Sequence, residues 1–308
     1  MVHKQRSVAL LFGLVIAADA AAGCSLKTVA VKTVANTLAA GGDTFTRDDD
    51  PELVRDAVPF ALKTYESLLE TVPKHAGLLL ATCSGFTQYA FAFVQADAET
   101  LESGDYEAAE ERKARALKLY LRGRGYCIRA LELKYKGIER QLQVAPDSAL
   151  TKATSADVPL LYWTGASWGA AIAIGLDRPA LVADLPAVMA LMKRALALQE
   201  DYRSGAIHEA MIALEGVPAA MGGSPERARA HFARAVALGG AGRPGPYLSL
   251  ATAVALPAQD RAEFDRLLEQ ALAIDPEKDP SNRLPTLISQ KRARFLLSRI
   301  DELFAPKN

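Results

Sequence analysis

Three short stretches decide the fold: KRALAL at 193–198, ARAVAL at 233–238 and EQALAI at 269–274. They align without gaps at steps of 40 and 36 residues, and a fourth copy, ARALKL at 114–119, lies 79 residues before the first. Steps of this size are typical of helix-pair repeats, in which each pair buries one face on the next. The small alanines would let neighbouring helices approach closely. The alternative is that Ala-rich amphipathic helices resemble one another by composition alone.

Helix-stopping residues recur with these copies and favour genuine repeats. A helix is expected to begin at Pro51, because Asp50 is a good N-cap and proline suits the first turn. Its apolar residues recur near the 3.6-residue period until Pro73. Few segments alternate apolar and polar residues as strands do. The chain is therefore predicted to be all-α, with paired helices stacked into a curved superhelical bundle over residues 51–308.

Composition excludes several classes of protein. Half of the 308 residues are apolar (50%), which is enough for a sizeable core, and 36 Lys and Arg balance 36 Asp and Glu. A chain without net charge has no long-range attraction for a polyanion, so nucleic acid is not expected as a partner. No stretch approaches the roughly 20 clean apolar residues that span a bilayer.

The N-terminus reads as a secretory signal over residues 1–23. His3, Lys4 and Arg6 form a cationic start, an apolar run covers 8–18, and small residues follow at 20–23. This apolar run is too short for a transmembrane helix. The mature protein would be exported, with residues 24–50 as an N-terminal segment and linker.

Small residues that lead straight into Cys24 resemble a bacterial lipobox, although Ala21 stands where leucine is usual and Asp19 is charged. The prediction is a diacylglycerol thioether and an N-acyl chain on Cys24, since several acyl chains anchor a protein stably. Ser25 rather than aspartate follows, which resembles the pattern for outer-membrane sorting. The alternative is an ordinary signal cut nearby.

Two catalytic motifs occur in the wrong setting. Gly165-Ala166-Ser167-Trp168-Gly169 matches the nucleophile elbow of serine hydrolases, which needs a strand before it and a helix after it. Here the motif runs on into an Ala- and Ile-rich stretch, so a small-residue helix face is the simpler interpretation, and a hydrolase is a distant third hypothesis. The GAGRPG at 240–245 matches a dinucleotide-binding pattern but follows an expected helix, so it is interpreted as a loop.

Metal and disulfide chemistry receive little support. His75, His208 and His231 lack the spacing of a metal motif and are interpreted as surface or hydrogen-bonded core residues. Cys83 and Cys127 have two open interpretations, a disulfide in the oxidising periplasm or buried small apolar side chains, and the second is favoured. No metal and no cofactor other than the lipid are expected.

Aromatic residues are the candidates for a ligand-binding cleft. Tyr162, Trp163 and Trp168 lie within seven positions of each other, and Tyr89 and Phe93 share an earlier helix. The concave face of a superhelix can present such side chains as an apolar cleft, although an aromatic stripe is more often core.

The chain resembles the T-component lipoproteins of TRAP transporters (TatT) over most of its mature length, Cys24 to Phe304. The most specific matching residues are Asp50-Pro51-Glu52-Leu53-Val54, Ala57-Val58-Pro59-Phe60, Leu62-Lys63, Glu66-Ser67-Leu68-Leu69, Tyr162-Trp163 to Trp168-Gly169, His231-Phe232 within 228–235, Arg283-Leu284 and 293–297. The resemblance implies cryptic tetratricopeptide-like (TPR-like) repeats, a lipid-anchored periplasmic protein, a homotrimer with a central opening, and no catalytic residues. It also implies exchange of a small apolar ligand with a periplasmic solute-binding protein.

Two functional hypotheses follow. The first is a non-enzymatic TRAP component that binds a small apolar ligand through Tyr162, Trp163, Trp168, Tyr89 and Phe93 and docks a solute-binding protein. The alternative is a general TPR-like scaffold lipoprotein of the cell envelope that carries no ligand.

Overall fold

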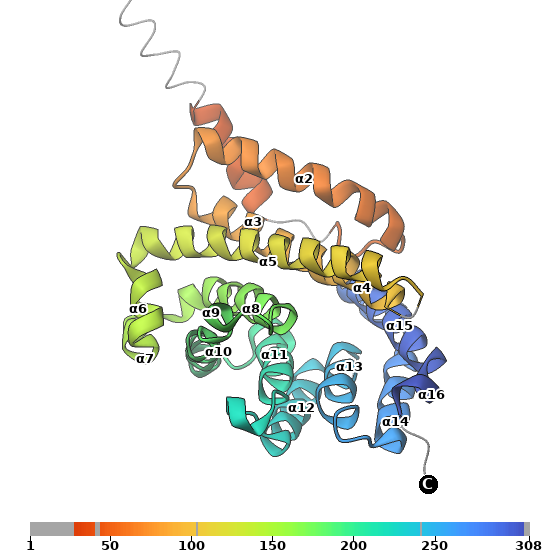
Figure 1. Cartoon of the computed structure of the whole chain (residues 1–308). Coiled ribbons are helices and arrows are strands. Elements are labelled where there is room, and N and C mark those ends of the chain that lie inside the picture. Colours follow the sequence, from red (N-terminus) through yellow and green to blue (C-terminus); the bar gives the residue numbers. More distant parts are fainter. Residues whose placement is uncertain (1–27, 41–43, 103, 241, 305–308) are drawn as a thin grey trace, which may run out of the picture.

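The computed structural model describes residues 28–40, 44–102, 104–240 and 242–304, and every regular element in these ranges is a helix (Figure 1). The predicted all-α class is confirmed. The predicted signal peptide, Cys24 and Ser25 lie outside the described residues.

The first half of the chain contains α2 (Pro51–Thr71), α3 (Ala76–Tyr89), η1 (Ala90–Gln95), α4 (Ala96–Leu101), α5 (Tyr106–Lys134), α6 (Ile138–Val144), α7 (Pro146–Ala149), η2 (Ser155–Asp157) and α8 (Val158–Ile174). The second half contains α9 (Pro179–Val182), α10 (Leu185–Leu198), η3 (Tyr202–Ser204), α11 (Ala206–Glu215), η4 (Ala219–Met221), α12 (Pro225–Gly239), α13 (Gly245–Leu250), η5 (Ala251–Ala255), α14 (Arg261–Leu272), η6 (Pro276–Lys278), η7 (Pro280–Asn282), α15 (Arg283–Ser298) and α16 (Ile300–Leu303).

Helix α2 begins at Pro51, as predicted. The Asp50 carboxylate accepts hydrogen bonds from the backbone N–H groups of Glu52 and Leu53, both at 3.0 Å. An earlier helix over residues 28–39 was not anticipated from the sequence. Its Ala35 is fully buried in a small core with Leu69 and Leu78, so the packed region extends N-terminal to α2.

The buried carboxylate of Glu66 joins α2 to α5. It accepts hydrogen bonds from Arg122 at 2.5 and 2.7 Å, from the Tyr126 hydroxyl at 2.7 Å and from Lys63 at 2.7 Å. Burial alone would raise the pKa of Glu66, but these donors lower it below its ordinary value. A charge that is buried and fully paired fixes the position of α2 on α5, because removing one partner leaves the other unsatisfied.

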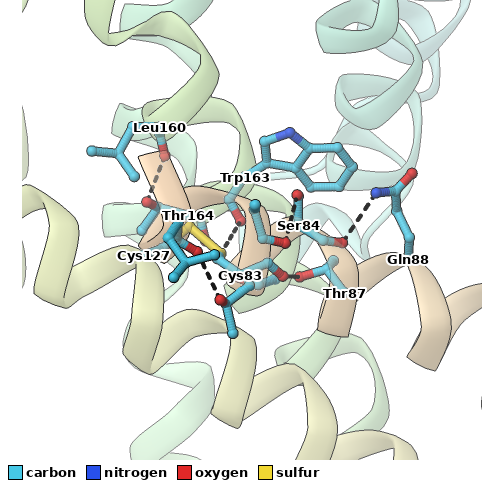
Figure 2. The surroundings of a disulfide bond; sticks show 12 residues. Cys83, Ser84, Thr87, Gln88, Cys127, Leu160, Trp163 and Thr164 are labelled. Carbon is cyan, nitrogen blue, oxygen red and sulfur yellow. Dashed lines mark hydrogen bonds between the residues drawn. A yellow bond between two sulfur atoms is a disulfide. The ribbon is translucent and has the colours of Figure 1, made fainter. Parts of the chain in front are cut away.

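A disulfide between Cys83 and Cys127 links α3 to α5, with the two Cα atoms 5.4 Å apart (Figure 2). The favoured interpretation of two buried unpaired cysteines was therefore wrong. Both positions are fully buried, and the Cys83 sulfur lies 3.9 Å from the carbonyl oxygen of Trp163 on α8. The spacing along the chain did not show that these two helices cross at their cysteines.

The crossing of α3 and α5 is also close at Gly123, one helical turn before Cys127. A Cβ atom there would lie 3.1 Å from both the Cys83 carbonyl oxygen and the Thr87 hydroxyl. A side chain at this position would have to displace its neighbours, so glycine favours the close approach of the two helices.

The helical run Ala76–Leu101, which joins α3, η1 and α4, is the one described segment long and apolar enough to cross a membrane. More than half of its apolar window is buried inside the protein, against α5 and α8 among others. We interpret it as a core element, because buried core helices share this composition.

The four repeated stretches occupy equivalent positions in packing. They lie in α5, in α10, in α12 and at the end of α14, and the alanine at the third place of each copy is almost fully buried: Ala116, Ala195, Ala235 and Ala271. A Cβ at Gly205 would lie 3.2 Å from the Cα of Ala235, which shows how close one neighbouring backbone comes. The buried alanines therefore lie where helices come close together, as the sequence predicted. The TPR-like character of these units stays a prediction.

Loss of the disulfide is expected to destabilise the protein. Replacing Cys83 and Cys127 together with alanine reopens a loop of 44 residues, which corresponds to about 4 kcal/mol in the chain-entropy model. Urea unfolding followed by circular dichroism measures the difference, and dithiothreitol added to the wild type is expected to reproduce it. Two thiols that react with Ellman's reagent in the unreduced, denatured Cys24→Ala protein would contradict the pairing.

Candidate functional site

The two ends of the helical array meet. The backbone N–H of Leu284, near the start of α15, donates to the carbonyl of Thr46 at 2.9 Å, and Leu284 packs in a small apolar cluster with Val54 and Phe93. Figure 1 shows α15 returning to the side of α4 at the end of a curved path through the other helices. Residues more than 180 positions apart in the chain therefore form one surface.

This junction contains a cavity of about 430 Å³, which we call the junction cavity. Its walls come from α2, η1, α4, the first turns of α5, and α15. The apolar part of the lining consists mainly of Ala92, Phe93, Ala96, Leu101, Ile288 and Phe295. The volume lies in the range of small-molecule sites, and a largely apolar wall with a few charged groups is their usual construction.

Charged side chains at the junction cavity form ion pairs across its walls. Arg55 of α2 binds Asp97 of α4 through two hydrogen bonds of 2.7 and 3.2 Å. Arg292 of α15 binds Glu99 of α4 in the same manner, at 2.7 and 2.9 Å. Lys291 of α15 lies 3.1 Å from Glu52 of α2. These pairs hold the three walls together, and bidentate pairs of this kind fix orientation as well as distance.

The π-helical turn η1 shapes one wall. It interrupts the regular helix between α3 and α4 and carries Phe93, which is 6% exposed and whose ring lies 5.4 Å from the Arg55 guanidinium. The ring of Tyr89 packs on Phe93 with centroids 5.7 Å apart. Two predicted cleft residues thus lie at this junction, and π-turns inside α-helices are frequent at functional sites.

Tyr162 and Trp163 lie elsewhere, at the N-terminal half of α8. Their ring centroids are 5.0 Å apart, and Tyr202 of η3 lies 5.3 Å from Tyr162. Trp168 is fully buried in the largest apolar cluster, with the Arg124 guanidinium 3.8 Å from its ring. The structure therefore does not bring the five predicted aromatic residues into one place. Nothing in the sequence distinguished the junction residues Arg55, Arg112 and Arg292 from arginines on a solvent-exposed helix face.

Glu209 of α11 is a half-buried carboxyl close to Tyr162 and lies against the backbone of Gly245. Within the described part of the chain, no hydrogen bond reaches its carboxylate. Burial raises the pKa of Glu209 to about 7, and the charge of Arg243 opposes this in part. Sequence reasoning missed this group because a single Glu after His208 matches no motif.

Ser167 lies in the middle of α8, fully buried, and its hydroxyl donates to the Thr164 carbonyl at 3.0 Å. The Gly-x-Ser-x-Gly stretch is therefore part of a helix, which is the simpler interpretation made from the sequence. The GAGRPG stretch follows helix α12, also as expected.

The three histidines, predicted to be surface or hydrogen-bonded core residues, all form hydrogen bonds. His208 Nδ1 lies 2.8 Å from His231 Nδ1, and His208 Nε2 lies 3.2 Å from Glu200 Oε1. Burial lowers the pKa of both imidazoles. His75 caps α3 by accepting the N–H of Leu78 at 3.0 Å. Across the described ranges, no group of three His, Cys, Asp or Glu side chains is arranged to hold a metal ion.

Comparison with known families assigns the chain. A family model described as TAtT, the TRAP transporter T-component, matches residues 47–304, from the segment before α2 to the end of α16. The chain belongs to the TRAP transporter T-component family. Members are accessory components of TRAP transport in the cell envelope and are not known as enzymes.

This T-component is similar to an uncharacterized protein of Treponema pallidum (strain Nichols). The two are 35% identical over 302 residues, which cover 92% of this chain and 94% of the relative.

The Glu209 carboxyl is expected to make stability depend on pH. Its folded-state pKa is about 7, whereas an unfolded chain binds this proton near pH 4.3, so the folded state holds the extra proton between these values. Stability contributed by that proton is complete below about pH 4 and is lost as the pH rises to 7. Glu209→Gln is expected to gain about 3.5 kcal/mol over the wild type at pH 8 and nothing at pH 4.

Urea unfolding at the two pH values measures this difference. Glu111→Gln, which removes an exposed carboxylate of α5, is the matched control and is expected to give no such pH-dependent gain. An equal effect of Glu209→Gln at pH 4 and pH 8 would contradict the assignment.

Proposed function

We propose that this T-component is a non-enzymatic, lipid-anchored protein of the periplasmic face of the envelope, and that it binds a small, largely apolar ligand in the junction cavity. The family assignment supports a place in TRAP transport. The observation that carries the ligand proposal is the cavity itself, about 430 Å³ with a mainly apolar lining. Phe93 lines it and Tyr89 supports Phe93 from behind.

Tyr162 and Trp163 are proposed as a secondary aromatic contact surface, with Trp168 as the buried support of their helix. The proposal also includes docking to a periplasmic solute-binding protein and assembly as a homotrimer of TPR-like protomers, both of which rest on the family. Exposed apolar side chains are available for such contacts on α2, where Leu53 and Phe60 are 59% and 78% exposed. Large exposed apolar side chains in succession along one helix are typical of interaction surfaces.

Anchoring is proposed to occur through acyl chains on Cys24, with sorting to the outer membrane directed by Ser25. Replacing Cys24 with alanine removes the thiol that would carry diacylglycerol, so the protein is expected to move from the membrane pellet to the soluble periplasmic fraction. Cell fractionation with immunoblotting measures the shift. Ser25→Ala is the matched control and is expected to stay in membranes, whereas Cys24→Ala that still pellets with membranes would count against the anchor.

Ligand binding is tested on the full mature chain carrying Cys24→Ala. Organic extraction followed by mass spectrometry is expected to release a small apolar molecule from this protein. The additional change Ala96→Trp fills the cavity from α4 and is expected to abolish the co-purification. A protein that binds a solute-binding partner but yields no extractable molecule would favour the general scaffold instead.

A further inference from the structure

The charges that line the junction cavity do not balance. Four cationic side chains reach it, Arg55, Arg112, Lys291 and Arg292, together with three acidic side chains, Glu52, Asp97 and Glu99. Each acidic group is already engaged by a cation other than Arg112. The pairs are Asp97 with Arg55, Glu99 with Arg292, and Glu52 with Lys291 and Arg55.

Arg112 is the cation left over. It lies in the second turn of α5, is half-buried, and has no hydrogen bond or ion pair within the described parts of the chain. Its position contrasts with that of Arg55 and Arg292, which are each held by two hydrogen bonds to a carboxylate. A guanidinium presents a planar fork of donors that matches a carboxylate or sulfonate, so Arg112 is a cation at the cavity wall whose donors are available to an anionic group.

We infer that the junction cavity takes a small molecule with one anionic group joined to an apolar body, and that Arg112 recognises the anionic group. The apolar side chains of η1, α4 and α15 would cover the body of the ligand, and the Arg112 guanidinium would supply a charge-assisted hydrogen bond to its head. A neutral ligand would leave Arg112 unpaired, and a cationic one would add to the excess positive charge. This inference rests on the proposed function and specifies the chemistry of its ligand.

Two dyes that differ by one charged group test the inference. 8-Anilinonaphthalene-1-sulfonate is an anion on an apolar aromatic body, and N-phenyl-1-naphthylamine is the same body without the sulfonate. Fluorescence titrations use the full mature chain with Cys24→Ala. In this background, Arg112→Gln is expected to lower the affinity for the anionic dye about tenfold and to change the affinity for the neutral dye by no more than about twofold. Added salt is expected to lower the affinity for the anionic dye more than the affinity for the neutral dye.

Two further variants locate the effect. Arg115→Gln removes an exposed cation from the same helix, outside the cavity lining, and is expected to change neither affinity. Ala96→Trp fills the cavity and is expected to abolish binding of both dyes. Circular dichroism confirms that each variant is folded before titration.

The outcomes separate the two proposals. If Arg112→Gln weakens both dyes equally, or weakens the anionic dye no more than Arg115→Gln does, Arg112 does not recognise the anion and the inference is overturned. If the anionic dye still binds to the Ala96→Trp variant, its site lies elsewhere, which also overturns the inference. In either of these outcomes, the proposed function still stands if the parent protein binds the neutral dye and the Ala96→Trp variant does not. If neither dye binds the parent protein, the junction cavity fails as a ligand site.

Discussion

The close crossing of α3 and α5 is the constraint on which the rest of the fold depends. Gly123 allows the two backbones to approach, the disulfide between Cys83 and Cys127 fixes them one turn further on, and the Trp163 carbonyl of α8 lies against the same sulfur (Figure 2). Helix α5 spans 29 residues, so its position is transmitted to both of its ends. The Glu66 network of α2 is bound at the crossing itself, by Arg122 and Tyr126, and the N-terminal part of α5 brings Arg112 to the junction cavity.

The second constraint is the return of α15 to α2 and α4. A curved stack of helix pairs has two free ends, and each end would ordinarily expose an apolar face. Here the ends cover one another: Leu284 packs with Val54 and Phe93, and the Arg292–Glu99 pair crosses between α15 and α4. The closing walls are joined by ion pairs and lined by small and aromatic side chains, and a cavity of about 430 Å³ remains between them. The cavity is therefore a consequence of closure.

The polar groups of this protein are suited to binding a ligand rather than to catalysing a reaction. The Ser167 hydroxyl donates a hydrogen bond to the backbone inside a helix, and the buried His208 is hydrogen-bonded to the half-buried His231 and to Glu200. In contrast, Arg112 beside the cavity and Glu209 near Tyr162 are polar groups without a hydrogen-bonded partner among the described residues. Such groups are available to bind a ligand or a partner. This contrast fits a family of transport accessories better than it fits an enzyme.

The sequence by itself determined the all-helical class and the buried alanines at which helices come close together. Its 3.6-residue periodicity, the Asp50 cap and the recurring alanines at 116, 195, 235 and 271 are local signals, and each was sufficient to predict an all-α chain with close helix contacts. Only the tertiary structure decided that Cys83 meets Cys127, that Phe93 and Trp163 lie in different places, and that Arg112 makes no ion pair with a described residue. The physical reason is that a helix forms from interactions within four residues, whereas Arg292 reaches Glu99 across 193 positions of chain. Such contacts follow from how the packed helices cross.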